Sequence, residues 1–208
     1  NGVSMWDVAV ERQVEIIGTD AEKLVQILCP RNLQKFNEGQ GKYVALCNHN
    51  GVIINDPIVL KLSQNRFWLS IADNNIVLFA RAIAAERNLN VEIFEPDVSP
   101  LAVQGPNAEN VIASIFGDWV RELKYFWFKE TIINGIPLQV ARSGWSKQGG
   151  FELYLMDGSK ASELWNLVKE AGKPWGIGPG NPNMSERIES GLLSYGSDTD
   201  DNTNPFEI

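Results

Sequence analysis

Residues 138–156 read LQVARSGWSKQGGFELYLM and carry the clearest strand–loop–strand pattern in the chain. The two ends of this stretch are rich in Val, Leu, Phe and Tyr, the residue types that are enriched in β-strands. The segment between them, 143–150, is polar and contains three glycines, as loops do. The sequence therefore predicts two strands, 138–142 and 151–156, on either side of a loop.

The rest of the chain predicts strands and helices in alternation, with tight turns at Asn50-Gly51 and Asn134-Gly135. Thr19 or Asp20 is expected to cap the first helix, and Pro30 to end it. Hairpins and interleaved helices favour an α+β fold, with antiparallel sheets flanked by helices, over a doubly wound parallel sheet. The predicted strands are 8–17, 43–47, 52–54, 58–62, 66–71, 91–94, 101–103, 125–129 and 132–133, and the predicted helices are 21–28, 76–87, 107–116, 159–171 and 185–193.

The charge and the rare residues exclude several classes of function. With 18 Lys and Arg against 26 Asp and Glu, the 208 residues carry a net charge of −8, which disfavours a nucleic acid as partner. The apolar runs are too short to span a membrane, and the start lacks the pattern of a signal peptide, so we expect a cytoplasmic protein. One His and two Cys are too few for a transition-metal site, and the thiols are expected to be reduced.

The ends of the sequence suggest a piece of a longer protein. The chain does not begin with Met, and it stops within a segment, 204–208, that looks ordered. We therefore expect a fragment.

Four motifs stand out in order along the chain, and a fifth run closes it. The motifs are 51–59 (GVIINDPIV), 101–106 (LAVQGP), 141–145 together with 150–154 (ARSGW and GFELY), and 187–196 (RIESGLLSYG), and the closing run is 200–207 (DDNTNPFE). In this order and at this spacing they resemble the signatures of the glycine-cleavage T-protein (aminomethyltransferase) family. The resemblance covers essentially the whole chain.

Where the chain departs from the aminomethyltransferase pattern, it is similar to the dimethylsulfoniopropionate demethylase branch of that family. The aminomethyltransferases usually have two aspartates where this chain has Asn55-Asp56, and Gly-Tyr-Thr-Gly-Glu where it has 144–148 (GWSKQ). An additional Arg of that pattern is missing from 178–182. Segments 29–31, 67–73 and 143–152 look like the demethylase version.

The resemblance implies a three-domain fold around a folate-binding channel. This chain would carry most of the first two domains, with 14–98 as an inserted α+β unit and the remainder belonging to the first domain. The C-terminal β-domain would be missing.

The implied reaction moves a methyl group from the sulfonium of dimethylsulfoniopropionate to N5 of tetrahydrofolate, giving 3-(methylthio)propanoate and 5-methyltetrahydrofolate. A sulfonium leaves as a neutral thioether, so the protein needs no metal and no strong acid. It must align the reactants and exclude water. Aromatic rings suit a cationic methyl donor, and the chain has 7 Trp, 9 Phe and 4 Tyr.

The resemblance assigns folate contacts to several residues, each with a plainer alternative. Glu152 matches the family glutamate that grips the pterin, although a strand carboxylate facing solvent is the alternative. Tyr154 shares its strand face, and Trp145 could stack on the pterin; core packing is the alternative for both rings. Arg187 would lie near the glutamate tail of the folate, or it could pair with acidic neighbours on a helix surface.

The remaining assignments concern the reacting centre and the channel. Asp56 matches the aspartate that faces the reactive centre of the folate, although it could be a turn residue before Pro57. Tyr43 matches a tyrosine near the folate, with a strand aromatic as the alternative. Phe126 is expected against the folate, with core packing as the alternative, and Trp6 near the substrate end of the channel.

Three other functions stay open at this point. The first is an aminomethyltransferase that meets a lipoyl-carrying protein. The second is a non-enzymatic folate-binding assembly factor for iron–sulfur proteins, although the chain lacks the Lys-Gly-Cys signature. The third is a folate-linked demethylase for another methyl donor. In each case the protein could also form a homodimer.

Overall fold

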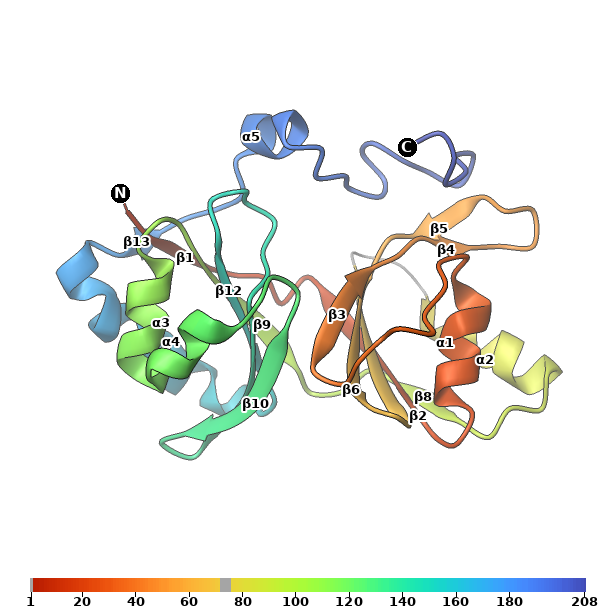
Figure 1. Ribbon diagram of the computed structural model, residues 1–208, viewed down its shortest axis with the longest axis horizontal. Helices are drawn as coiled ribbons and strands as arrows, with labels where there is room; N and C mark the ends of the chain where they lie inside the picture. The colour runs from red at the N-terminus through yellow and green to blue at the C-terminus, as the bar shows by residue number, and fades with distance from the viewer. Residues whose placement is uncertain (1, 72–75) are drawn as a thin grey trace. The chain divides into compact units, whose positions relative to one another are not determined.

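The computed structural model describes residues 2–71 and 76–208, and it divides into two compact units (Figure 1). Unit 1 comprises residues 1–9 and 97–192, and unit 2 comprises residues 10–96 and 193–208. Each unit therefore combines segments that are far apart in the sequence. The last two residues of the 67–73 motif, Ala72 and Asp73, lie outside the described residues.

Unit 1 is built on a six-stranded sheet with the order β10-β11-β12-β9-β1-β13. Neighbouring strands run antiparallel, except that β1 and β13 are parallel. The strands are β1 (Ser4–Asp7), β9 (Ser99–Gln104), β10 (Phe128–Ile133), β11 (Ile136–Ala141), β12 (Gly150–Leu155) and β13 (Gly178–Pro179).

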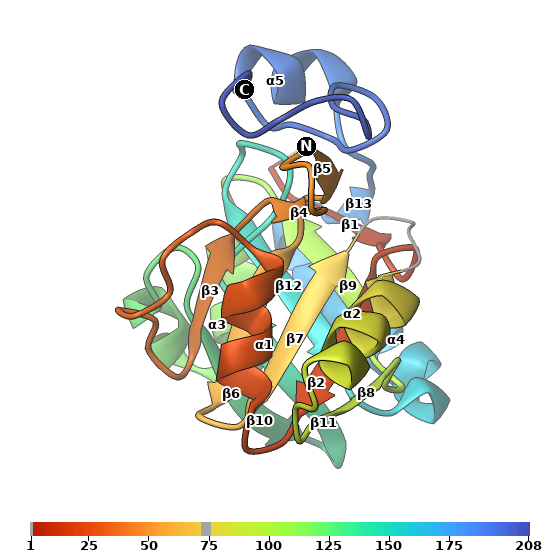
Figure 2. The same ribbon diagram turned by 90° about the vertical axis from the view of Figure 1, so that its right-hand side faces the viewer.

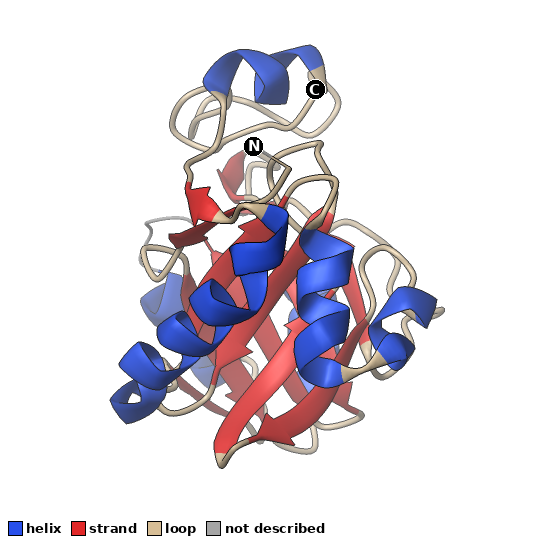
Figure 3. Ribbon diagram, turned by 90° about the vertical axis from the view of Figure 1, so that its left-hand side faces the viewer, coloured by secondary structure: helices blue, strands red, loops and turns tan. Residues whose placement is uncertain are grey.

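Two helices, α3 (Ala108–Phe116) and α4 (Ala161–Gly172), cover one face of this sheet (Figure 3). Alternate residues of the strands, such as Val103 on β9 and Leu153 on β12, point to that face and join the buried cluster with Val111 and Val168 of the helices. The opposite face of the sheet carries polar side chains such as Glu152 and Gln139, which are buried. A short third helix, α5 (Met184–Glu189), follows β13.

Unit 2 contains a five-stranded antiparallel sheet with the order β3-β6-β7-β2-β8, and helices α1 (Ala21–Leu28) and α2 (Ile76–Glu86) lie across it (Figure 2). A separate pair, β4 with β5, forms the hairpin predicted at Asn50-Gly51. The strands are β2 (Arg12–Ile17), β3 (Gln40–Tyr43), β4 (Leu46–Cys47), β5 (Ile53–Asn55), β6 (Ile58–Ser63), β7 (Arg66–Ile71) and β8 (Glu92–Phe94).

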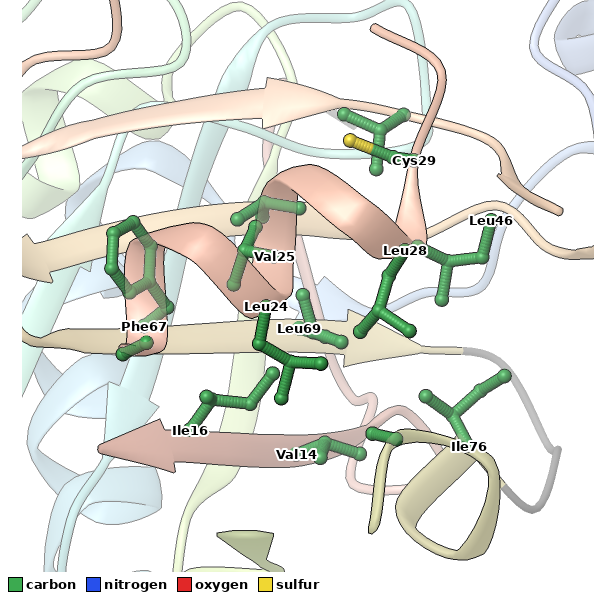
Figure 4. Packing of buried hydrophobic residues seen from close by; sticks show 14 of the residues in the cluster. Val14, Ile16, Leu24, Val25, Leu28, Cys29, Leu46, Phe67, Leu69 and Ile76 are labelled. Atoms are coloured by element: carbon green, nitrogen blue, oxygen red, sulfur yellow. The ribbon is translucent and has the colours of Figure 1, made fainter. Parts of the chain in front are cut away.

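The core of unit 2 forms where the apolar face of α1 meets the sheet (Figure 4). Leu24 and Leu28 are four residues apart and therefore share one helical face, which packs against Ile16 and Leu69. The helix ends before Pro30, as predicted. Asp20 is at the N-cap, but its side chain makes no cap bond and instead accepts from the backbone N–H of Asn90.

These two units confirm the α+β prediction with antiparallel sheets. The predicted strand 8–17 is too long, because only residues 12–17 form a strand, β2. The residues before β2 form a turn, in which the Asp7 carboxylate accepts from the N–H of Ala9 and Val10 is 72% exposed. The strand β1, which belongs to the other sheet, is not among the predicted strands.

Other predicted boundaries also differ from the structure. The predicted strand 43–47 is interrupted, because residue 43 ends β3 and residues 46–47 form β4 in a separate sheet. Residues 125–127 are not part of a strand: Phe126 has a left-handed φ of 62°, and β10 begins only at Phe128. The last predicted helix, 185–193, is shorter, since α5 ends at Glu189 and Gly191 follows with a φ of 66°. Within the described part of the chain, no helix combines the length and the apolar character needed to cross a membrane.

Candidate functional site

The face of the unit 1 sheet opposite α3 and α4 gathers the first group of candidate residues. Glu152 and Tyr154 are two residues apart on β12, while Phe151 and Leu153 point into the core. Successive side chains of a strand point to opposite faces, so Glu152 and Tyr154 share the face opposite the core. The prediction that the two residues share a face is therefore confirmed.

Glu152 is a buried carboxylate held by two hydroxyl groups. Its side chain is only 7% exposed, so the alternative of a solvent-facing strand residue is wrong. Ser143 Oγ donates a hydrogen bond to Glu152 Oε2, and Tyr154 Oη lies 3.4 Å from the same oxygen, a long hydrogen bond. Burial raises the pKa of Glu152, and the bonds from Ser143 and Tyr154 oppose that rise.

A cavity of about 400 Å³ opens in unit 1 next to this carboxylate. Its volume lies in the range of small-molecule sites. Ser143 belongs to its wall, so the residue whose hydroxyl binds Glu152 also borders the cavity. The lining residues are Gln104, Tyr125, Ser143, Gly144, Lys147, Gly149, Gly150, Ser190 and Leu192.

These residues fit a ligand such as a pterin, which presents neighbouring N–H donors. Both hydroxyl donors of the protein reach Oε2 of Glu152, so the carboxylate keeps acceptor capacity at Oε1. A carboxylate can receive two parallel N–H bonds. The assignment of these residues to the folate stays a prediction.

Trp145 and Arg187 meet beside the loop that joins β11 and β12. The guanidinium carbon of Arg187 lies 5.0 Å from the centroid of the Trp145 ring, a cation–π contact. Arg187 is only 3% exposed, so it is not on a helix surface, and its Nη1 donates to the carbonyl of Leu192 at 3.1 Å. A second link joins Gln148 of the loop to Glu186 of α5 at 2.8 Å.

Trp6 lies in the same cross-strand row as Glu152. In the sheet register Trp6 is opposite Ala102, and Ala102 is opposite Glu152. Strand partners in register point to the same face, so the indole and the carboxylate share the face opposite the helices, with a small alanine between them. The indole N–H is buried and has no hydrogen-bond partner among the described residues.

Phe126 occupies an unusual backbone position beside the cavity. Its φ of 62° is rare for a bulky residue, and its N–H donates to the carbonyl of Arg142 at 2.9 Å. The ring of Phe126 lies 4.3 Å, centroid to centroid, from the ring of Tyr125. Tyr125, rather than Phe126, belongs to the cavity wall.

Asp56 and Tyr43 form the second group of candidate residues, in unit 2. Asp56 lies between β5 and β6, and Tyr43 is the last residue of β3. Tyr43 Oη donates to Asp56 Oδ2 at 2.9 Å. Asp56, predicted for the reacting centre, and Tyr43, predicted near the folate, are thus hydrogen-bonded to each other.

The electrostatic setting of Asp56 adjusts its protonation close to neutral pH. The pKa of Asp56 is raised to about 6, and burial is the largest cause. Hydrogen bonds from Tyr43, from its own N–H and from the N–H of Tyr195 oppose this rise, and the charge of Asp198 adds to it. Burial and the Asp56 charge together raise the pKa of Tyr43. Asp56 is therefore mostly ionised at pH 7, and its carboxylate can stabilise a nearby positive charge.

The sequence interpretation assigned no role to three residues that the structure places at these sites. They are Ser143 and Gln104 at the cavity and Tyr125 on its wall. Ser143 and Gln104 stood inside the recognised motifs, but a hydroxyl or an amide in a motif does not reveal its partner. Tyr125 stood in an aromatic run, 125–128, that read as a strand.

Comparisons with known proteins extend this description. The family model described as the GCVT N-terminal domain matches residues 1–208. The chain is 46% identical over 205 residues to "Dimethylsulfoniopropionate demethylase DmdA" of Ruegeria pomeroyi, covering 99% of this chain and 56% of that protein. It is 32% identical over 213 residues to "Aminomethyltransferase" of Caldanaerobacter subterraneus subsp. tengcongensis, covering 100% of this chain and 57% of that protein.

The fold also matches a solved structure. It superposes on glycine cleavage system aminomethyltransferase T from Bartonella henselae with a TM-score of 0.83 at 23% identity, covering 98% of this chain and 55% of that one. The chain spans about half the length of the curated relatives it matches. The resemblance read from the ordered motifs is confirmed at the level of the family.

Proposed function

The chain belongs to the GCVT N-terminal domain family, and from this membership we propose that the protein is a tetrahydrofolate-dependent methyltransferase that demethylates dimethylsulfoniopropionate. The structural observation that supports it most is Glu152, buried and held by Ser143 at the edge of a cavity. The 46% identity to DmdA favours a sulfonium over an aminomethyl group as the donor. Family relatives at 32% identity make the aminomethyltransferase the second candidate.

The proposed role of Glu152 is to bind and orient the pterin of tetrahydrofolate. Its carboxylate accepts from the donors of the pterin, while Ser143 and Tyr154 hold one of its oxygens in place. Trp145, ordered against Arg187, offers an aromatic face beside the cavity loop. Trp6, on the same sheet face as Glu152, is proposed to contact the methyl donor.

In the proposed reaction the lone pair of N5 attacks the methyl carbon, the carbon–sulfur bond breaks toward sulfur, and N5 releases its proton to solvent. The sulfonium becomes a neutral thioether, so positive charge leaves sulfur during the step. Asp56 is proposed to stabilise the positive charge that moves from sulfur toward N5, because its carboxylate is buried yet mostly ionised at pH 7. Tyr43 holds the carboxylate in one orientation.

The role of Glu152 can be tested by Glu152→Gln in the full-length protein. The amide keeps the shape but replaces one acceptor oxygen by a donor, which would face the donors of the pterin. We expect the dissociation constant for tetrahydrofolate, measured by calorimetry, to rise at least about tenfold. Glu163→Gln, at an exposed position on α4, is the matched control and should leave the affinity unchanged.

The reaction itself is tested by supplying dimethylsulfoniopropionate and tetrahydrofolate to the full-length protein and measuring 5-methyltetrahydrofolate. Formation of this product supports the proposal. If none forms while a lipoylated aminomethyl donor is turned over, the proposal is wrong and the second candidate replaces it. We expect this activity to be cytoplasmic. A homodimer stays a prediction, which light scattering of the full-length protein can check.

A further inference from the structure

Gln104, the last residue of β9, is a buried polar side chain to which the proposed chemistry gives no part. It is 3% exposed, and its amide is fully engaged. Gln104 Nε2 donates to the carbonyl of Ser143 at 2.9 Å and to the carbonyl of Phe151 at 3.0 Å. Its Oε1 accepts from Ser146 Oγ at 2.7 Å.

These three bonds join one side chain to both ends and the middle of the loop between β11 and β12. The main chain adds a fourth tie, since the N–H of Gly105 donates to the carbonyl of Gly149 at 2.8 Å. At Gly144 the loop backbone contacts the amide so closely that an added Cβ would lie 2.1 Å from Gln104 Oε1. The loop is therefore wrapped around the Gln104 side chain.

The loop held in this way carries Ser143, which borders the cavity, and Trp145. Ser143, whose carbonyl accepts from Gln104, uses its hydroxyl to bind Glu152. Trp145, which contacts Arg187, lies between Ser143 and Ser146, the two loop residues bonded to Gln104. The amide of Gln104 thus anchors the chain on both sides of Trp145 and directly at Ser143.

We propose that Gln104 is the positioning residue of this site: by fixing the loop it sets the orientation of Ser143 and Trp145 before tetrahydrofolate binds. This inference rests on the proposed function for the identity of the ligand, and it deepens that function. Gln104 acts through the loop and not on the ligand, because both N–H bonds of its amide are used by protein carbonyls. A site whose groups are ordered in advance binds more tightly, since less entropy is lost on binding.

The first test measures the loop without any ligand. Gln104→Met keeps a side chain of similar length but removes all three bonds. In hydrogen–deuterium exchange of the full-length protein, we expect amides in 144–150 to exchange at least about tenfold faster in this variant, because a locally opened segment loses its protection. Gln139→Met is the matched control: Gln139 is also buried and hydrogen-bonded in unit 1, but it is absent from the cavity wall.

A second variant separates hydrogen bonding from packing. Gln104→Glu retains the shape but places a carboxylate oxygen against the carbonyls of Ser143 and Phe151, which repel it. We expect faster loop exchange than in Gln104→Met at pH 8, with partial recovery of the protection factors near pH 6, where a protonated carboxyl group again offers one donor. A role in packing alone would give no such pH dependence.

The third measurement connects the loop with binding. We expect Gln104→Met to weaken tetrahydrofolate binding about tenfold or more in calorimetry, and Gln139→Met to leave it unchanged. Unchanged loop exchange in Gln104→Met, or faster exchange with unchanged affinity, overturns the role of Gln104. If the unmodified protein does not bind tetrahydrofolate at all, the proposed function fails, while the exchange measurements still decide whether Gln104 holds the loop.

Discussion

Two carboxylates, Glu152 and Asp56, lie in different units and in different hydrogen-bond settings. Burial raises the pKa of both. Glu152 is held by two side-chain hydroxyls, whereas Asp56 receives one phenol and two backbone N–H groups. At the scale of the residue, the partners of each carboxylate decide what it can do, and each can be tested separately.

Asp56→Asn should change how stability depends on pH. The pKa of Asp56 is about 6 in the folded chain and about 4 in an unfolded one, so the folded state binds the proton more tightly. The free energy of unfolding therefore falls as pH rises from about 4 to about 6, and the loss persists above pH 6.

The asparagine variant removes this dependence. At pH 7 we expect this variant to be more stable than the unmodified protein. The gain in the free energy of unfolding is up to about 3 kcal/mol, reduced by the energy lost when the hydrogen bond from Tyr43 is altered. Urea unfolding at pH 4, 5, 6 and 7 measures the effect. Glu38→Gln, at an exposed position in the same unit, should leave the pH dependence as it is. Parallel curves for Asp56→Asn and the unmodified protein would contradict the prediction.

Tyr43→Phe should shift the activity of the full-length protein along the pH axis. The variant keeps the ring but removes the hydroxyl that donates to Asp56 at 2.9 Å. Without that donor the pKa of Asp56 rises above about 6. We expect the acid limb of the kcat profile to move up by about one pH unit, because a bond to a charged group is worth about 1.5 kcal/mol. An acid limb at an unchanged pH would show that Asp56 does not govern the rate.

At the scale of the element, the sequence of α1 explains which face of the helix joins the core of unit 2. Leu24, Val25 and Leu28 are buried, whereas Glu22 and Lys23 are exposed. The helix is short for one that is stable in isolation, so its stability must come from packing against the sheet. Its face contacts Ile16 and Leu69 of the sheet, which links the helix to β2 and β7 (Figure 4).

Leu24→Ala should therefore destabilise the protein by about 2–5 kcal/mol, since it removes fully buried methyl groups and leaves a cavity. The neighbouring Lys23→Ala is the control, and we expect its effect to stay within about 0.5 kcal/mol. Denaturant unfolding measures both. Similar values for the two variants would mean that α1 does not carry the core as described.

At the scale of the whole molecule, the buried apolar side chains of the described residues form two separate clusters. One cluster contains Leu24 and belongs to unit 2, and the other contains Leu153 and belongs to unit 1. Each core joins distant parts of the chain: in unit 1, β1 at the start of the chain pairs with β9, which begins at Ser99.

Because Leu24 and Leu153 lie in different clusters, their effects on stability should add. We expect the free-energy change of the double variant, Leu24→Ala with Leu153→Ala, to equal the sum of the single changes within about 0.5 kcal/mol. Denaturant unfolding of the full-length protein, with both single variants as references, provides the comparison. A larger deviation would mean that the two cores are energetically coupled.

Most of the elements and the family can be predicted from the sequence. The apolar run at 66–71 predicted β7 with the bounds that the structure gives, and a cap at residue 19 or 20 together with Pro30 predicted α1 at 21–28. The motif around Glu152 pointed to its strand and its shared face with Tyr154. These features are local, since they depend on the periodicity of a single strand or helix, and that periodicity is written in neighbouring residues.

Which of these elements and side chains meet depends on the tertiary structure. The sequence did not predict β1, and it extended β2 back to residue 8, because the pairing of β1 with β9 and of β2 with β7 depends on residues about 50 to 100 positions away. The same holds for the contact of Arg187 with Trp145 and for the three bonds of Gln104. Long-range packing brings these groups together, and no local pattern in the chain encodes their partners.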